Sequence, residues 1–177
     1  MEAFNAWHGL SLGDDAPGTV VAVIENNTSS KAKYEIDKES GMLMLDRVLT
    51  SSVRYPANYG FLPKTYCDDN DPLDILVICQ EDLQPMSLVE AKVIGVMKMT
   101  DDGEQDDKLI AVAAKDYQWK HVEDVSDLPD HLVAEMKNFF ETYKRLKGGE
   151  VEVTDVLGRK EALKVVEDSI KLYNEKF

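Results

Sequence analysis

The chain has 177 residues, of which 44% are hydrophobic and 31% are charged, a composition typical of a globular protein rather than a disordered one. Its net charge of −14 argues against a nucleic acid or an anionic membrane as partner, because both require a basic protein surface. No apolar run approaches the ~20 residues of a membrane span, and residues 1–4 lack the basic and apolar regions of a secretory signal. Cys67 and Cys79 form no CxxC pair, so we expect free thiols in a reducing cytoplasm. These features predict a single cytoplasmic domain spanning residues 1–177.

In chain order, an N-terminal arm over residues 1–18 is followed by strands and then by helices. The expected strands are β-branched or alternating runs bounded by Gly, Asp, Asn and Pro, at residues 19–24, 33–36, 42–49, 75–79, 89–99 and 109–113. Residues 55–60 have the composition of a turn. Helical spacing of apolar residues predicts a largely helical region over about 129–176, with one helix stopping at Gly148-Gly149 and a second over 159–175. Strands first and helices last indicate an α+β fold, with helices outside a closed or twisted antiparallel sheet.

Two acidic clusters stand at the ends of expected strands. Residues 68–74 hold four carboxylates immediately before one strand, and residues 101–107 form a hairpin-like loop that leads into another. Such crowding raises the energy of every negative charge unless a cation lies among them. Carboxylate oxygens select hard cations, which favours Mg²⁺ or Mn²⁺ over zinc. Two separate acidic loops exposed to solvent remain the alternative interpretation.

A calcium-binding module is a rival class, and the EF-hand pattern tests it. If the loop began at Asp69, the glycine position would hold Asp74 and the terminal glutamate position would hold Gln80. Both residues break the pattern, which excludes an EF-hand but leaves a looser calcium site open.

Basic residues near these clusters are candidates for an anionic ligand. Arg47 lies inside an apolar strand, where a guanidinium either pairs with a structural carboxylate or grips a phosphate through two hydrogen bonds. Lys33 and Glu35 point to the same side of another strand, and a surface ion pair explains them equally well.

Phenols complete the candidate set. Tyr55 and Tyr59 lie four residues apart, and Tyr143-Lys144 ends the first expected helix. Core packing is the plain explanation for each tyrosine, and Lys144 also suits a helix C-terminus. Taken together, oxygen ligands for metals and donors from Arg, Lys and Tyr indicate a site for a polyphosphate.

The sequence of residues 69–75, Asp-Asn-Asp-Pro-Leu-Asp-Ile, resembles the signature of the soluble family I inorganic pyrophosphatases. Further motifs follow in family order over residues 20–147: KYEIDK at 33–38, DR at 46–47, YPANYGF at 55–61, GVMKM at 95–99 and FFETYK at 139–144. The short chain resembles the bacterial branch of the family. One departure is Asn26-Asn27 after Glu25, where relatives carry an aliphatic residue and proline.

The resemblance implies a distorted five-stranded antiparallel β-barrel of oligonucleotide-binding (OB) type with flanking C-terminal helices, and hydrolysis of pyrophosphate with Mg²⁺ as cofactor. Mn²⁺ is a possible substitute. The metal ligands it implies are Asp69, Asp74, Asp101, Asp106, Glu35 and Glu25. Asp71 is the implied general base, supported by Tyr55. The implied substrate-binding residues are Lys33, Arg47, Lys108, Tyr143, Lys144 and Tyr59.

Rival functions remain at this point. A metal-dependent phosphohydrolase could act on nucleotides or longer polyphosphates, although the sequence has no Walker motif and no added motif for a base. A non-enzymatic calcium-binding or OB-type binding module is the other class, and the acidic charge opposes nucleic acid as its ligand. By family analogy we expect a homo-oligomer, specifically a hexamer, with pyrophosphate as its partner and neither nucleic acid nor membrane.

Overall fold

The computed structural model describes residues 4–177, so residues 1–3 of the expected N-terminal arm lie outside the described part. Its elements in chain order are α1 (Ala6–Gly9), β1 (Thr19–Asn26), β2 (Ala32–Ile36), β3 (Leu43–Val48), β4 (Asn58–Phe61), β5 (Asp74–Ile78), β6 (Leu88–Asp101), β7 (Glu104–Gln105), β8 (Lys108–Ala113), the 3-10 turn Val125–Asp127, α2 (Asp130–Thr142), the 3-10 turn Arg145–Lys147, β9 (Val151–Gly158) and α3 (Arg159–Lys176). Within this part of the chain, no helix combines the length and apolarity that crossing a membrane requires.

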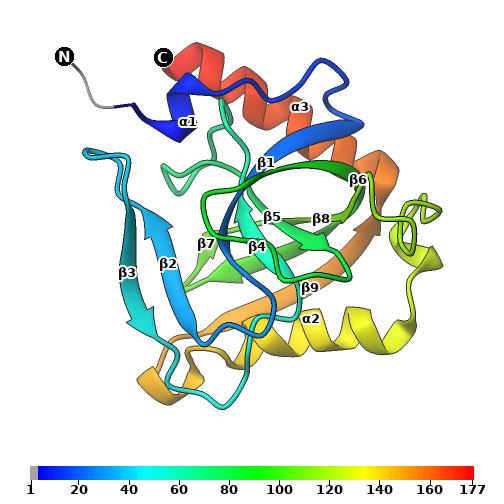
Figure 1. The fold of residues 1–177 in the computed structure, drawn as a ribbon. Coiled ribbons are helices and arrows are strands. Elements are labelled where there is room, and N and C mark those ends of the chain that lie inside the picture. The colour runs from blue at the N-terminus through cyan, green and yellow to red at the C-terminus, as the bar shows by residue number, and fades with distance from the viewer. Residues whose placement is uncertain (1–3) are drawn as a thin grey trace.

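Five strands close a ring in the order β1–β4–β5–β8–β6, because β6 pairs back with β1 (Figure 1). The ring confirms the predicted five-stranded barrel with flanking helices. All its pairings are antiparallel except the parallel pair of β5 and β8, which corrects the expectation of a wholly antiparallel sheet. The strands approach closely where β4 crosses β1, since a Cβ on Gly60 would overlap the carbonyl group of Val23. Beyond the ring, the second half of β6 pairs with β9.

Alternate side chains of the central strands enter two different apolar clusters. In β5, Ile75 packs in the cluster that α3 closes with Val166, whereas Leu76 packs in the cluster that α2 closes with Phe139. Both faces of this strand are therefore covered, which explains why residues 75–79 form an unbroken apolar run instead of an alternating one.

The strands β2 and β3 form a separate two-stranded sheet that stands beside the ring (Figure 1). Asn26, at the end of β1, anchors this hairpin because its side chain accepts from the Tyr34 amide at 2.7 Å and donates to the Tyr34 carbonyl at 2.9 Å. Asn26 is only 1% exposed, so the residue that departs from the family motif serves as a buried link between ring and hairpin. Exposed apolar side chains gather along the outer strand at Met42, Met44, Leu45 and Val48.

Three segments differ from the sequence prediction. The expected turn at 55–60 contains β4, whose four residues are buried between β1 and β5. The expected helical region over 129–176 is interrupted by β9, whose valines Val151 and Val153 follow strand alternation and pair with the end of β6. The helix α2 ends at Thr142, before the glycines predicted to stop it, and Gly148, with a φ of 82°, instead ends the short turn that follows.

Candidate active site

The two acidic loops converge because they lead into neighbouring parallel strands. The loop 68–73 enters β5 and the loop 102–107 enters β8, and the first residues of these strands, Asp74 and Lys108, are partners in register. Parallel strands begin at the same edge of a sheet, so both clusters open at one end of the ring. The one parallel pairing in the ring thus explains why the two acidic loops meet.

A cavity of about 280 Å³ opens at this end of the ring. All of the residues predicted for the site line it, with the exception of Tyr55. The Tyr55 ring is 2% exposed and lies beneath the cavity, with its centroid 5.3 Å from that of Tyr59 and 4.7 Å from that of Phe139. A larger cavity of about 570 Å³ near β6 is lined by apolar and polar side chains in equal number, and none of the residues predicted for the site is among them, so we assign the chemistry to the smaller cavity.

Lys108 lies at the floor of this cavity between two carboxylates. Its Nζ is 2.5 Å from Asp74 Oδ2 and 2.5 Å from Asp106 Oδ1, and the Tyr59 hydroxyl donates to the same Asp74 oxygen at 2.6 Å. Burial alone would lower the pKa of Lys108, but the two carboxylates hold that pKa above its usual range. Burial likewise raises the pKa of Asp106 and of the Tyr59 phenol. Lys108 therefore stays charged and offsets part of the negative charge of the two carboxylates.

A second group of contacts closes the cavity from the side of α2. Tyr143 follows the last residue of α2, and its hydroxyl lies 3.1 Å from Asp101 Oδ2. Lys144 pairs with Asp101 and also with Asp102, at 2.9 Å, and these carboxylates raise the pKa of Lys144 against the effect of its partial burial. Asp102 in turn accepts from the Glu150 amide at 2.9 Å. Asp102 thus holds Lys144 at the cavity. The sequence patterns did not predict this role for Asp102.

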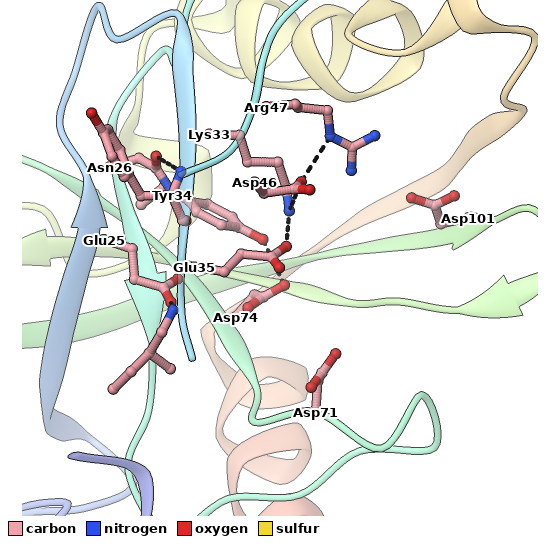
Figure 2. A network of polar contacts seen from close by, with 12 residues as sticks. Glu25, Asn26, Lys33, Tyr34, Glu35, Asp46, Arg47, Asp71, Asp74 and Asp101 are labelled. Carbon is pink, nitrogen blue, oxygen red and sulfur yellow. Dashed lines mark hydrogen bonds and ion pairs between the residues drawn. The ribbon is translucent and has the colours of Figure 1, made fainter. Parts of the chain in front are cut away.

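The hairpin supplies the cations on the opposite side. Arg47 Nε lies 2.8 Å from Asp46 Oδ2, and Lys33 Nζ lies 3.3 Å from the same oxygen (Figure 2). Lys33 also pairs with Glu35, the neighbour on its side of the strand. Burial lowers the pKa of Lys33, although the nearby Asp46 opposes that shift. The carboxylate that pairs with Arg47 is thus the adjacent Asp46. The sequence analysis did not predict Asp46 as a site residue.

Glu25 and Asp69 are the carboxylates in this cavity that burial affects most clearly. Glu25 is 5% exposed and accepts from the Ile36 amide at 2.7 Å, and desolvation together with the nearby Asp74 raises its pKa to about 8. Desolvation also raises the pKa of Asp69 to about 6. A buried carboxyl group with a raised pKa is one that a divalent cation would stabilise strongly in its charged form.

Asp71 lies on the loop 68–73, with its side chain apart from that of Asp74 at the start of β5 (Figure 2). Its backbone amide donates to Asp69 Oδ1 at 3.1 Å, and its carbonyl accepts from the Cys67 amide at 2.9 Å. Asn70 adopts a φ of 68°, a left-handed conformation that asparagine tolerates better than most residues. These local bonds turn the loop back on itself and place the Asp71 side chain at the cavity.

The donor set fits hard divalent cations. Six of the lining side chains are carboxylates predicted as metal ligands, and these offer only oxygen donors, as Mg²⁺ and Mn²⁺ prefer. In residues 4–177 no three acidic, histidine or cysteine side chains yet surround a single point. The Lys108 ammonium instead lies between Asp74 and Asp106, and desolvation, with nearby carboxylates adding to its effect, raises the pKa of Asp69 and of Glu25.

Comparisons with known proteins agree with this geometry. The family model described as inorganic pyrophosphatase matches residues 22–174. Soluble inorganic pyrophosphatase 2 of Chlamydomonas reinhardtii is 54% identical over 175 residues, which cover 99% of this chain and 91% of that protein. The soluble inorganic pyrophosphatase of Zea mays is 47% identical over 171 residues, covering 97% of this chain and 80% of that protein. The solved structure of inorganic pyrophosphatase from Thermus thermophilus aligns with a TM-score of 0.93 and 42% identity, covering 97% of this chain and 99% of that one. The chain therefore belongs to the family I inorganic pyrophosphatases.

Proposed function

We propose that the cavity at the open end of the ring hydrolyses pyrophosphate to two phosphates, with Mg²⁺ as the metal and Asp71 as the general base. The observation that carries this proposal is the composition of one 280 Å³ cavity, where seven carboxylates face a set of lysine, arginine and tyrosine donors. Carboxylates alone would repel a polyanion, and cations alone would not hold a metal. The combination suits a substrate that arrives with divalent cations.

On the hairpin side, Lys33 and Arg47 hold phosphate oxygens, and the planar guanidinium of Arg47 suits a two-bond grip. Lys108, Lys144 and Tyr143 bind the oxygens of the other phosphate from the ring and the end of α2, where they absorb negative charge as the phosphates separate. The tyrosine keeps its proton at neutral pH because burial raises its pKa, so its hydroxyl remains a donor.

Metal ions bound by the carboxylates supply the acidification of water and the shielding of the phosphate charges. Asp71 then accepts the proton that the attacking water releases. Its place on the loop 68–73, apart from Asp74 at the start of β5, suits this separate task (Figure 2). We assign direct metal contacts to Asp69, Asp74, Asp101 and Asp106, and contacts through water to Glu25 and Glu35.

The test is phosphate release from pyrophosphate, measured with Mg²⁺, with Mn²⁺ and after exhaustive chelation, beside ATP as an alternative substrate. We expect rapid release from pyrophosphate with Mg²⁺, partial replacement by Mn²⁺, slow release from ATP and none after chelation. Equal activity in EDTA would contradict the metal mechanism. Faster release from ATP would favour the rival nucleotide phosphohydrolase.

We further propose that residues 1–177 act as one domain in the cytoplasm and assemble as a homo-oligomer, a hexamer by family analogy. The exposed apolar side chains Met44, Leu45 and Val48 on β3, with Met42 just before it, support association, because apolar groups gathered on an edge strand favour contact with another chain. Sedimentation at micromolar concentration should show a multiple of the 19.9 kDa chain, and a purely monomeric species would contradict the assembly.

A further inference from the structure

The Asp71 side chain forms an ion pair with a lysine that the site assignment leaves without a role. Lys38, two residues beyond the end of β2, places its Nζ against Asp71 Oδ1 across 33 positions of sequence. Both side chains line the cavity and both are half-exposed, at 51% for Lys38 and 49% for Asp71. Such an exposed pair contributes little to stability, because solvent screens it and the lysine loses side-chain freedom. Its importance therefore depends on what holds the lysine in place.

The N-terminal helix α1 supplies that support. The Lys38 Nζ lies 5.6 Å from the centroid of the Trp7 ring, within the range of a cation–π contact. Asn5 Nδ2 donates to the Lys38 carbonyl at 2.8 Å, which fixes the backbone of the same lysine. Trp7 itself is 4% exposed, so the ring beneath the ammonium is a rigid, buried platform.

The same tryptophan is also bonded to the loop that carries Asp71. Trp7 Nε1 donates to the Thr65 carbonyl at 2.7 Å, and the Lys64 amide donates to the Trp7 carbonyl at 2.8 Å. The Thr65 hydroxyl accepts from the Leu73 amide at 2.9 Å and donates to the Leu62 carbonyl at 2.8 Å, which ties the two ends of the loop together. Trp7 thus contacts both the segment that leads into the acidic loop and the lysine that pairs with Asp71 on that loop.

From these contacts we propose that Lys38 and Trp7 are positioning residues for the reaction. Trp7 fixes Lys38 relative to the acidic loop. Lys38 in turn holds the Asp71 carboxylate in the orientation in which it accepts the proton from water. Lys38 engages Oδ1, and among residues 4–177 no hydrogen-bond donor reaches Asp71 Oδ2, so the second oxygen is left for the water. The inference rests on the proposed role of Asp71 as the base. It makes the N-terminal helix part of the active-site architecture although it lies outside the acidic clusters.

A double-mutant cycle tests the proposal with the full chain, Mg²⁺ and pyrophosphate. Lys38→Met should lower kcat by about 10- to 100-fold with little change in KM and melting temperature, since misplacing a reacting group by an ångström costs up to about 100-fold. Lys38→Arg should recover most of kcat, because it keeps the charge over the Trp7 ring. In an Asp71→Asn background, Lys38→Met should cause almost no further loss, because the residue that it positions is already gone.

The matched control is Lys164→Met, which removes the same charge from an exposed lysine on α3 outside the cavity, and it should leave kcat unchanged. Trp7→Phe keeps a ring but loses the Nε1 bond to Thr65, and its loss of kcat should also shrink in the Asp71→Asn background.

The proposal is overturned if Lys38→Met keeps the wild-type kcat, raises KM alone as a phosphate ligand would, or costs the same factor with and without Asp71. An Asp71→Asn single variant with wild-type kcat would refute the base assignment as well, which separates the two failures.

Discussion

Lys33 and Arg47 are register partners across the β2–β3 ladder, and both reach the same oxygen of Asp46. The pairing sets two cations side by side on the hairpin and holds them with one carboxylate. The side chain of Arg47 is still 31% exposed, so its guanidinium remains available to a ligand in the cavity. The hairpin therefore places two cations side by side at the cavity, the arrangement that the proposed binding of phosphate requires.

Replacing Arg47 by lysine tests whether the guanidinium is needed for substrate. We expect Arg47→Lys to lower kcat/KM for pyrophosphate by about 10- to 100-fold, since a point charge replaces a two-bond fork worth about 1.5–3 kcal/mol. The melting temperature should change little, because the half-exposed pair with Asp46 contributes little to stability. Steady-state kinetics and thermal melts of the same samples measure both effects.

Arg54→Lys is the control for this variant, because Arg54 is an exposed arginine that bonds the Ser29 carbonyl outside the cavity. It should retain full activity. If Arg47→Lys instead unfolds at lower temperature while each folded molecule keeps its activity, the pair with Asp46 is structural and the substrate role of Arg47 is wrong.

The raised pKa of Glu25 predicts a pH dependence of stability for the metal-free protein. The folded state keeps the Glu25 proton up to a pKa of about 8, whereas the unfolded chain releases it near 4.5. Between these values the folded state binds more protons, so this group lowers the free energy of unfolding as pH rises. In EDTA, Glu25→Gln should gain stability relative to the wild type from pH about 5 to about 8 and then level off.

Denaturant unfolding of both proteins over this pH range measures the difference directly. Glutamine keeps the carbonyl oxygen that accepts from the Ile36 amide, so the comparison isolates the titrating proton. A difference that is independent of pH would show that Glu25 is not buried as the structure describes.

Asp124 joins two segments that are distant in sequence and should be a stability determinant away from the cavity. Its carboxylate accepts from the Ser126 amide at 3.1 Å and from the Arg159 amide at 2.7 Å, so it caps the turn at Val125–Asp127 and the start of α3. These donors lower the pKa of Asp124, so its stabilisation is present above the ordinary value of 3.8 and is lost as pH falls through the folded value.

Asp124→Ala should therefore cost about 0.5–2 kcal/mol at neutral pH, the usual range for a lost cap, and the cost should shrink in acid. Chemical denaturation at pH about 7 and about 3 measures the change. Asp14→Ala, a change at an exposed residue of the turn before β1, should cost little at either pH. An Asp124→Ala cost that is equal at both values would mean that the charge of Asp124 is not what stabilises the helix start.

Most of the ring could be predicted from local patterns, because each strand carries its own β-branched or alternating signal. The parallel pairing of β5 and β8 could not, since pairing direction depends on contacts between segments far apart in sequence. The strand β9 could not be predicted although Val151 and Val153 alternate, because the apolar residues on either side of it recur at helical spacing. The strand β4 could not be predicted, because Pro56 and Asn58 are typical of a turn, and only the pairing with β1 and β5 makes Asn58–Phe61 a buried strand.

The chemistry of the candidate site was visible in the sequence, but its internal pairing was not. Clustered aspartates indicated a metal site, and a family resemblance assigned the remaining residues. The sequence could not indicate that Lys108 lies between Asp74 and Asp106, or that Lys38 reaches Asp71, because both arrangements follow from how the loops meet in space. The role of Asp102 as an anchor for Lys144 depends in the same way on a contact over 42 positions.

A paired measurement on three variants separates the proposed general base Asp71 from the neighbouring metal ligands Asp69 and Asp74. Metal affinity by calorimetry with Mn²⁺ and kcat with Mg²⁺ are measured for Asp69→Asn, Asp71→Asn and Asp74→Asn. We predict that Asp69→Asn and Asp74→Asn weaken metal binding, whereas Asp71→Asn binds metal nearly as the wild type does and loses about 10²–10⁴-fold in kcat, the usual contribution of a general base. An Asp71→Asn protein that loses metal as severely as Asp74→Asn, or that keeps the wild-type kcat, would contradict the account.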